Sequence, residues 1–132
     1  MEHVLKSKAG KTLEQSYKGL AFTNSNGKAE CVEFVRQTLN SPPTTAWSEG
    51  RKVKSGVALT AGTAIATFIN GKYPQVGSTG KHAAIYLGQN AIGIQVLDQW
   101  ATQGSVQPRI IKWKPTSPSL SNDANAFSVI EW

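Results

Sequence analysis

The sequence predicts a single α+β domain spanning residues 1–132, with N-terminal helices packed on an antiparallel β-meander. The first observation is that apolar residues recur at helical spacing only ahead of residue 40. The second is that short apolar and β-branched runs, separated by turn residues, fill most of the chain after residue 61. The third is composition, since 39% hydrophobic and 17% charged residues are typical of a folded globular chain.

The first helix is expected over residues 12–18. Leu13, Tyr17 and Leu20 share one helical face, and Gly19 favours termination because glycine readily adopts the left-handed conformation that ends helices. This predicted helix is short.

The second helix is expected over residues 29–39, after a cluster of turn and N-cap residues at 23–28. It stops at residues 41–43, Ser-Pro-Pro, because the proline ring disfavours helical dihedrals in the residue before it. Its apolar residues recur at helical spacing: Val32, Val35 and Leu39. Cys31 therefore falls in the first turn of a helix.

The remaining elements are predicted as strands and loops. Five apolar or β-branched runs are predicted as strands: 62–69, 82–87, 92–100, 108–113 and 126–132. Asn70-Gly71 is a strong turn dipeptide, and Gly88-Gln89-Asn90 ends the second strand. Loops are predicted at 72–81 and 115–125, and at the polar segment 47–56 with at most one short helical turn.

Composition and charge exclude several function classes. The net charge of +6 favours an anionic partner such as nucleic acid, a membrane surface or the bacterial cell wall. We expect no nucleic acid, because no basic run is interleaved with stacking aromatics, and no nucleotide, because the glycines lack phosphate-loop spacing. No apolar stretch approaches the roughly 18 residues of a membrane span, so no membrane insertion is expected. Residues 1–11 lack the apolar region of a signal peptide, which predicts synthesis in the cytoplasm and export by another route.

Metal and disulfide chemistry are not expected. Cys31 is the only cysteine, and the two histidines, His3 and His82, are far apart in the sequence. A free cysteine in a helix is commonly a small buried hydrophobe. At a helix start, however, peptide dipoles and unpaired N–H groups stabilise a thiolate, so Cys31 is a candidate nucleophile that needs no cofactor.

His82 and Asp98 are the candidate partners of that thiol. His82 opens an apolar strand after Gly80-Lys81, so a stiff strand would hold its ring as a general base requires. Asp98 lies in the apolar run 96–100, where a buried carboxylate needs a partner; an edge-strand solubility charge is the alternative. The hairpin turn near residues 88–91 makes His82 and Asp98 cross-strand neighbours. Cys31, His82 and Asp98 are thus candidate nucleophile, base and orienting residue.

Three aromatic residues are candidates for substrate contact. Trp100, two residues past Asp98 on the same strand face, would wall the cleft. Tyr86 lies four residues past His82 on the same face of its strand. Trp47 could be a substrate platform or a core residue. Gln99 should point to the opposite face from Asp98, which makes Gln99→Ala a control.

Four segments, 27–35, 62–68, 80–87 and 96–100, resemble the successive blocks of the CHAP-type and NlpC-like amidases, which are papain-like peptidoglycan hydrolases. The resemblance implies a papain-like fold and assigns Cys31 as nucleophile, His82 as base and Asp98 as the acidic residue. The sequence departs from the family pattern at Glu30, where Asp often precedes the cysteine, at Lys81, inserted before the histidine, and at Trp100, which replaces an Asn.

The chain further resembles small type VI secretion amidase effectors. That resemblance implies an antibacterial toxin that hydrolyses amide bonds in peptidoglycan stem peptides or crosslinks in the target periplasm. A cognate immunity protein and a secretion-apparatus component are the implied partners. Three alternatives remain open: a phage lysin domain, a catalytically silent peptide-binding module, and a cysteine protease or deamidase toxin that acts on a host protein.

Overall fold

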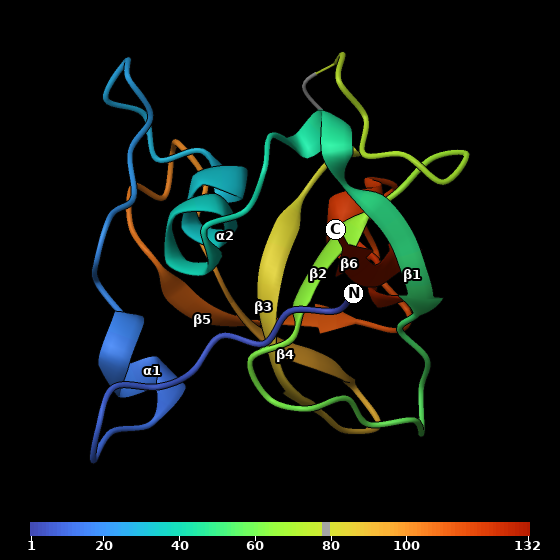
Figure 1. Cartoon of the computed structure of the whole chain (residues 1–132). Coiled ribbons are helices and arrows are strands. Elements are labelled where there is room, and N and C mark those ends of the chain that lie inside the picture. Colours follow the sequence, from blue (N-terminus) through green and yellow to red (C-terminus); the bar gives the residue numbers. More distant parts are fainter. Residues whose placement is uncertain (78–79) are drawn as a thin grey trace.

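The computed structural model describes residues 1–77 and 80–132, and Figure 1 shows its α+β architecture. Within these residues, a six-stranded antiparallel sheet has the order β1-β6-β2-β3-β4-β5. The strands are β1 (Ser48–Lys52), β2 (Ala64–Thr67), β3 (Ala83–Gln89), β4 (Gly93–Asp98), β5 (Gln107–Lys112) and β6 (Phe127–Glu131). The helices are α1 (Leu13–Tyr17) and α2 (Cys31–Leu39), with 3-10 turns η1 (Thr44–Ala46), η2 (Leu120–Asn122) and η3 (Ala124–Ala126). The predicted α+β class is confirmed.

Both predicted helices are confirmed, with shifted ends. Thr12 caps α1 by a capping box, in which its hydroxyl accepts from the Gln15 backbone N–H at 3.1 Å and the Gln15 side chain accepts from the Thr12 N–H at 2.9 Å. Helix α2 begins at Cys31, two residues after the predicted start at residue 29. Asn40 ends α2 in the left-handed conformation, with a φ of 51°.

The sheet carries an apolar cluster on each face, because alternate side chains along a strand point in opposite directions. The cluster on the α2 face contains buried side chains from α2, β3 and β4, including Phe34, Val35, Ile85 and Leu97. The cluster on the other face includes Ile65, Tyr86, Ile94, Val96 and Phe127. Fully burying a side chain such as Phe34 contributes about 2 kcal/mol, so α2 is held by its apolar face.

Strand order differs from a simple meander at one edge. Strands β2 to β5 do follow one another as predicted, but β6 lies between β1 and β2. The segment 47–56, predicted as a loop, contains β1, so that prediction is wrong. The five residues of β1 are polar and largely exposed, because an edge strand is held by backbone hydrogen bonds and needs no apolar face.

The two other predicted loops are mostly irregular. Residues 72–77 and 80–81 form no helix or strand, and residues 78–79 of that predicted loop lie outside the described residues. The segment 115–125 contains η2 and the start of η3. No helix in the described ranges is long and apolar enough to cross a membrane.

Candidate active site

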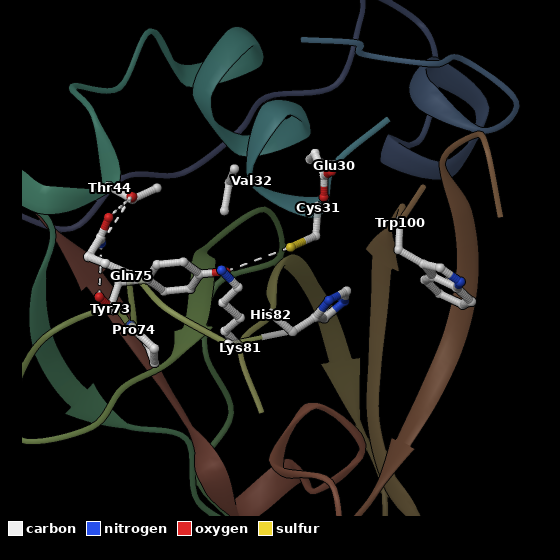
Figure 2. Close-up of a pocket in the computed structure, with 11 residues that line it drawn as sticks. Glu30, Cys31, Val32, Thr44, Tyr73, Pro74, Gln75, Lys81, His82 and Trp100 are labelled. Atoms are coloured by element: carbon white, nitrogen blue, oxygen red, sulfur yellow. Dashed lines mark hydrogen bonds between the residues drawn. The ribbon is translucent and has the colours of Figure 1, made fainter. Parts of the chain in front are cut away.

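A cavity of about 490 Å³ opens at the N-terminal end of α2 (Figure 2). Cys31, His82, Tyr73 and Trp100 line it. Figure 2 shows the Cys31 sulfur between the Tyr73 hydroxyl and the His82 ring, with Trp100 beyond the ring. The cavity therefore brings the only thiol and one of the two histidines to the same wall.

Cys31 is half-buried, and its Sγ lies 3.7 Å from the Tyr73 hydroxyl oxygen. Burial alone would raise the pKa of the Cys31 thiol. The hydrogen bond from His82 and its positive charge, the Ala83 backbone N–H and the Tyr73 hydroxyl outweigh burial, so this pKa lies below its ordinary value. The arrangement favours a thiolate at neutral pH.

His82 and Asp98 form a buried pair. His82 Nε2 donates to Asp98 Oδ2 at 2.6 Å; His82 is 5% exposed and Asp98 is 0% exposed. The register pairs Ile85 with Leu97, which sets Asp98 opposite Ala84 and diagonal to His82. The proximity predicted from the hairpin is confirmed. Because Nε2 is engaged by the carboxylate, Nδ1 is the ring nitrogen left for the thiol.

The backbone of His82 is also fixed. Its N–H donates to Thr67 Oγ1 at 3.0 Å, and its carbonyl accepts from the Thr67 backbone N–H at 3.0 Å. Thr67 ends β2, so the sheet holds His82 even though the histidine precedes the first residue of β3. A fixed ring is what a general base requires.

Burial disfavours the imidazolium form of His82 and would lower its pKa. The Asp98 carboxylate and the Cys31 thiolate outweigh burial and raise the pKa of His82 to about 9. The lowered pKa of the Cys31 thiol and the raised pKa of the His82 imidazole together favour a thiolate beside an imidazolium.

Arg109 was not foreseen from the sequence. Its Nε donates to Asp98 Oδ2 at 2.7 Å, and its guanidinium lies 5.2 Å from the centre of the Trp100 ring. A buried carboxylate is costly without a cation, so Arg109 compensates the charge of Asp98. The sequence predicted that β5 lies beside β4. It did not indicate which residue of β5 lies close to Asp98.

Tyr73 was also missed, because it lies in a predicted loop without periodicity. Its side chain is buried, with 5% exposed. Burial, and after it the neighbouring Cys31 thiolate, raise the pKa of Tyr73. The phenol therefore stays protonated and keeps an O–H donor close to Cys31 Sγ.

The aromatic candidates separate into one cavity residue and two core residues. Trp100 is 37% exposed, lines the cavity and meets the His82 ring edge-on at 6.3 Å. Trp47 is 3% exposed and packs against Tyr73 at 5.2 Å, which favours its alternative role as a core residue. Tyr86 is fully buried in the opposite cluster, its hydroxyl donates to Gln89 Oε1 at 2.9 Å, and it does not line the cavity. Strand alternation does place Tyr86 on the same face as His82, but at Tyr86 this face is covered by the apolar core.

The side chains of the described residues form no candidate metal site. Across residues 1–77 and 80–132, no group of three or more His, Cys, Asp or Glu residues could hold a metal ion.

A helix-start cysteine packed against an antiparallel sheet defines a papain-like α+β protein, and comparison with known proteins identifies its family. The chain belongs to the domesticated amidase effector 2 family, whose family model matches residues 3–130. The protein is therefore an amidase, as the resemblance of its sequence blocks predicted.

Two related proteins and one solved structure support this membership. The chain is 33% identical over 114 residues to the type VI secretion amidase effector 2 protein of Salmonella typhi, covering 77% of this chain and 84% of the relative. It is 33% identical over 106 residues to domesticated amidase effector 2 of the tick Ixodes scapularis, covering 77% of this chain and 71% of that protein. The solved structure of type 6 secretion amidase effector 2 (Tae2) superposes with a TM-score of 0.76 at 28% identity, covering 96% of this chain and 94% of that chain.

Proposed function

We propose that the protein is a cysteine amidase that hydrolyses amide bonds in peptidoglycan stem peptides or crosslinks, and that it acts as an antibacterial effector exported to the target cell wall. Family membership supports the amidase activity, and the names of the relatives support type VI delivery. The net charge of +6 suits an anionic wall.

One observation carries the cysteine mechanism. Cys31 and His82 line the same cavity while His82 Nε2 is committed to the buried Asp98 at 2.6 Å. In that geometry Nδ1 can hold the thiol proton and later release it, and Asp98 stabilises the imidazolium. Cys31, His82 and Asp98 are therefore assigned as nucleophile, base and orienting residue.

Acylation begins when the Cys31 thiolate attacks the amide carbonyl carbon. A C–S bond forms, and the carbonyl π electrons move to the oxygen. His82 Nδ1–H then protonates the leaving amine as the C–N bond breaks. The products of this step are a free amine and a thioester on Cys31.

Deacylation uses Cys31 and His82 again, with His82 now acting as the base. Neutral His82 takes a proton from water, the hydroxide oxygen attacks the thioester carbon, and the C–S bond breaks. The acyl part leaves as a carboxylic acid, and the thiolate–imidazolium pair is restored. Hydrolysis of the amide is balanced by one water.

Two donors are available for the oxyanion of each tetrahedral intermediate. The first backbone N–H groups of α2 have no acceptor within the helix, and their dipoles favour negative charge. The Tyr73 hydroxyl, 3.7 Å from Cys31 Sγ, is the second. We assign Tyr73 to this role because its O–H remains protonated throughout the cycle.

Trp100 is assigned to substrate binding. Its exposed indole forms the wall of the cavity beside His82, where an extended peptide can lie against it. The same opening is the surface that a cognate immunity protein would occlude. A secretion-apparatus component is the further partner, which the type VI relatives suggest.

The test is digestion of purified peptidoglycan, with mass analysis of the released fragments. For each amide bond cleaved, the parent should generate one new amine and one new carboxyl group, on the two sides of the cut. It should do so in the presence of EDTA, because the proposed chemistry needs no metal. Cys31→Ala should release none while it retains the parent circular dichroism spectrum.

Two outcomes would contradict the proposal. Equal digestion by Cys31→Ala would remove Cys31 from the mechanism. Failure of the parent to digest any wall preparation, with cleavage or deamidation of a host protein, would assign the same site to a different substrate.

A further inference from the structure

Gln99 follows Asp98 at the end of β4, and its side chain is completely buried. Its Oε1 accepts from the Phe22 backbone N–H at 3.1 Å, and its Nε2 donates to the Phe22 carbonyl at 2.7 Å and to the Glu30 carbonyl at 2.8 Å. Both Nε2 hydrogens therefore have acceptors. These bonds tie the loop that leads into α2 to the sheet.

The bond to Glu30 matters because Glu30 is the N-cap residue of α2 and directly precedes Cys31. Its side chain makes no capping hydrogen bond. Its carbonyl accepts from the Glu33 backbone N–H at 3.0 Å, so the Gln99 amide holds the same oxygen that starts the helix. The position of the Cys31 backbone therefore depends on this oxygen.

We propose that Gln99 is a positioning residue for the reaction, which sets Cys31 at its working distance from His82. Asp98 bonds the histidine from one face of β4, and Gln99 bonds the peptide preceding the cysteine from the other. The dipeptide Asp98-Gln99 thus bonds the His82 ring and the backbone that precedes Cys31. The inference rests on the cysteine mechanism proposed above.

Gln99 is therefore not a neutral position for a control substitution. Gln99 does point away from Asp98, as alternation predicts. The opposite face, however, carries the Cys31 loop, so Gln99→Ala is not a neutral control. A displacement of about 1 Å between reacting groups can cost on the order of 100-fold in rate, which is why a hydrogen bond one residue from the nucleophile is consequential.

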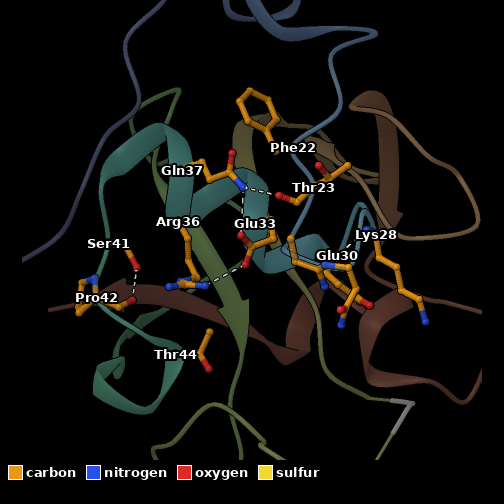
Figure 3. A network of polar contacts seen from close by, with 12 residues as sticks. Phe22, Thr23, Lys28, Glu30, Glu33, Arg36, Gln37, Ser41, Pro42 and Thr44 are labelled. Atoms are coloured by element: carbon orange, nitrogen blue, oxygen red, sulfur yellow. Dashed lines mark hydrogen bonds and ion pairs between the residues drawn. The ribbon is translucent and has the colours of Figure 1, made fainter.

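Gln37 offers a matched control on the same loop (Figure 3). Its Nε2 donates to the Thr23 carbonyl at 2.9 Å and to Glu33 Oε1 at 3.0 Å, and Glu33 also pairs with Arg36 at 2.9 Å. Gln37 therefore fastens the loop to α2 one residue after Phe22, but it does not bond Glu30 and does not line the cavity. Gln37→Met and Gln99→Met make the same chemical change at these two places.

The experiment compares both variants with the parent in three measurements: kcat and KM on soluble peptidoglycan fragments, the pH midpoint of Cys31 alkylation by iodoacetamide, and urea unfolding. Gln99→Met should lower kcat about 10- to 100-fold with KM changed less than about 3-fold, because ground-state contacts with substrate are untouched. Its alkylation midpoint should move up toward that of an ordinary thiol, because the thiolate loses its place beside the imidazolium. Gln37→Met should retain the parent kcat and midpoint even where its unfolding midpoint falls.

Gln99→Asn provides a second test if Gln99→Met proves too unstable to fold. It keeps an amide but is one methylene shorter, so it cannot reach both Phe22 and Glu30, and it should move kcat and the alkylation midpoint in the same direction. A folded Gln99→Met or Gln99→Asn with parental kcat and midpoint would overturn the proposal. Equal losses of kcat in Gln37→Met would overturn it as well, because a general loosening of the loop would then explain the effect of both substitutions. If the parent itself showed no low-pH alkylation and Cys31→Ala stayed active, the cysteine mechanism would fail instead.

Discussion

The buried Asp98 carboxylate bonds both His82 and Arg109 through its Oδ2. Asp98→Asn keeps the size of the side chain but removes the charge that stabilises the imidazolium. We expect kcat/KM on purified peptidoglycan to fall about 100- to 10,000-fold, by analogy with acid-to-amide changes in catalytic triads. Asp123→Asn makes the same change in the loop before η3, where Asp123 bonds Asn125, and should leave the rate near the parental value. A parental rate for Asp98→Asn would exclude the orienting role.

The raised pKa of His82 predicts an unusually alkaline limit to activity. Acylation needs the thiolate, which is present above the lowered pKa of Cys31, and the imidazolium, which is present below the pKa of about 9 of His82. A kcat/KM profile should therefore rise through the lowered pKa of Cys31 and fall only as the pH rises through about 9. In Asp98→Asn the falling limb should move to lower pH, because a hydrogen bond and a charge that raise the pKa are lost. A parental profile that already falls between pH 6 and 7 would contradict the assignment, because an unperturbed histidine titrates near there.

At the residue scale, sequence reasoning found the site members that local patterns mark. Cys31 follows turn residues and opens a helical pattern, and the hairpin between residues 82 and 98 brings His82 and Asp98 together. Tyr73 and Arg109 could not be found this way. Tyr73 meets Cys31 across 42 residues from an irregular segment, and nothing in its neighbours encodes that contact.

At the scale of elements, Gly62 fixes the approach of the N-terminal segment to β2. Its φ is 102°, and an added Cβ would lie 2.2 Å from the Leu5 carbonyl oxygen. Gly62→Ala should therefore lower the free energy of unfolding by about 2–4 kcal/mol, from backbone strain and the steric clash together. Gly56 also has a positive φ, of 84°, but an added Cβ meets nothing within 4 Å, so Gly56→Ala should cost only about 1 kcal/mol. Urea denaturation measures both, and equal losses would remove the clash from the explanation.

The strands also show which elements can be predicted from apolar periodicity and which cannot. The helices and five of the strands carry periodic apolar residues, because each buries one face or both. The β1 sequence, Ser-Glu-Gly-Arg-Lys, carries no such pattern because it is exposed at the sheet edge. The position of β6 between β1 and β2 depends on the unpredicted β1 and on pairing across most of the chain, so a local pattern could not give it.

At the scale of the whole molecule, the net charge of +6 predicts salt-sensitive association with the wall. Exposed lysines such as Lys6, Lys8 and Lys11 are screened by salt, with a Debye length of about 8 Å at physiological ionic strength. We expect the fraction of Cys31→Ala protein that sediments with purified walls to fall several-fold between 20 and 300 mM NaCl, values that are roughly below and above the physiological range. Sedimentation that does not change with salt would mean that the cavity, and not the charge, governs binding to the wall.

Iodoacetamide alkylation of Cys31 and peptidoglycan hydrolysis, followed in the same samples across pH, test the thiolate–imidazolium mechanism directly. We expect a single modified residue, Cys31, with fast labelling below the pH at which an ordinary thiol reacts, and hydrolysis lost in proportion to labelling. His82→Ala should label more slowly at pH 7 than the parent, because the imidazolium no longer stabilises the thiolate. Labelling that appears only after the protein unfolds, or hydrolysis that persists once Cys31 is fully alkylated, would contradict the thiolate–imidazolium mechanism.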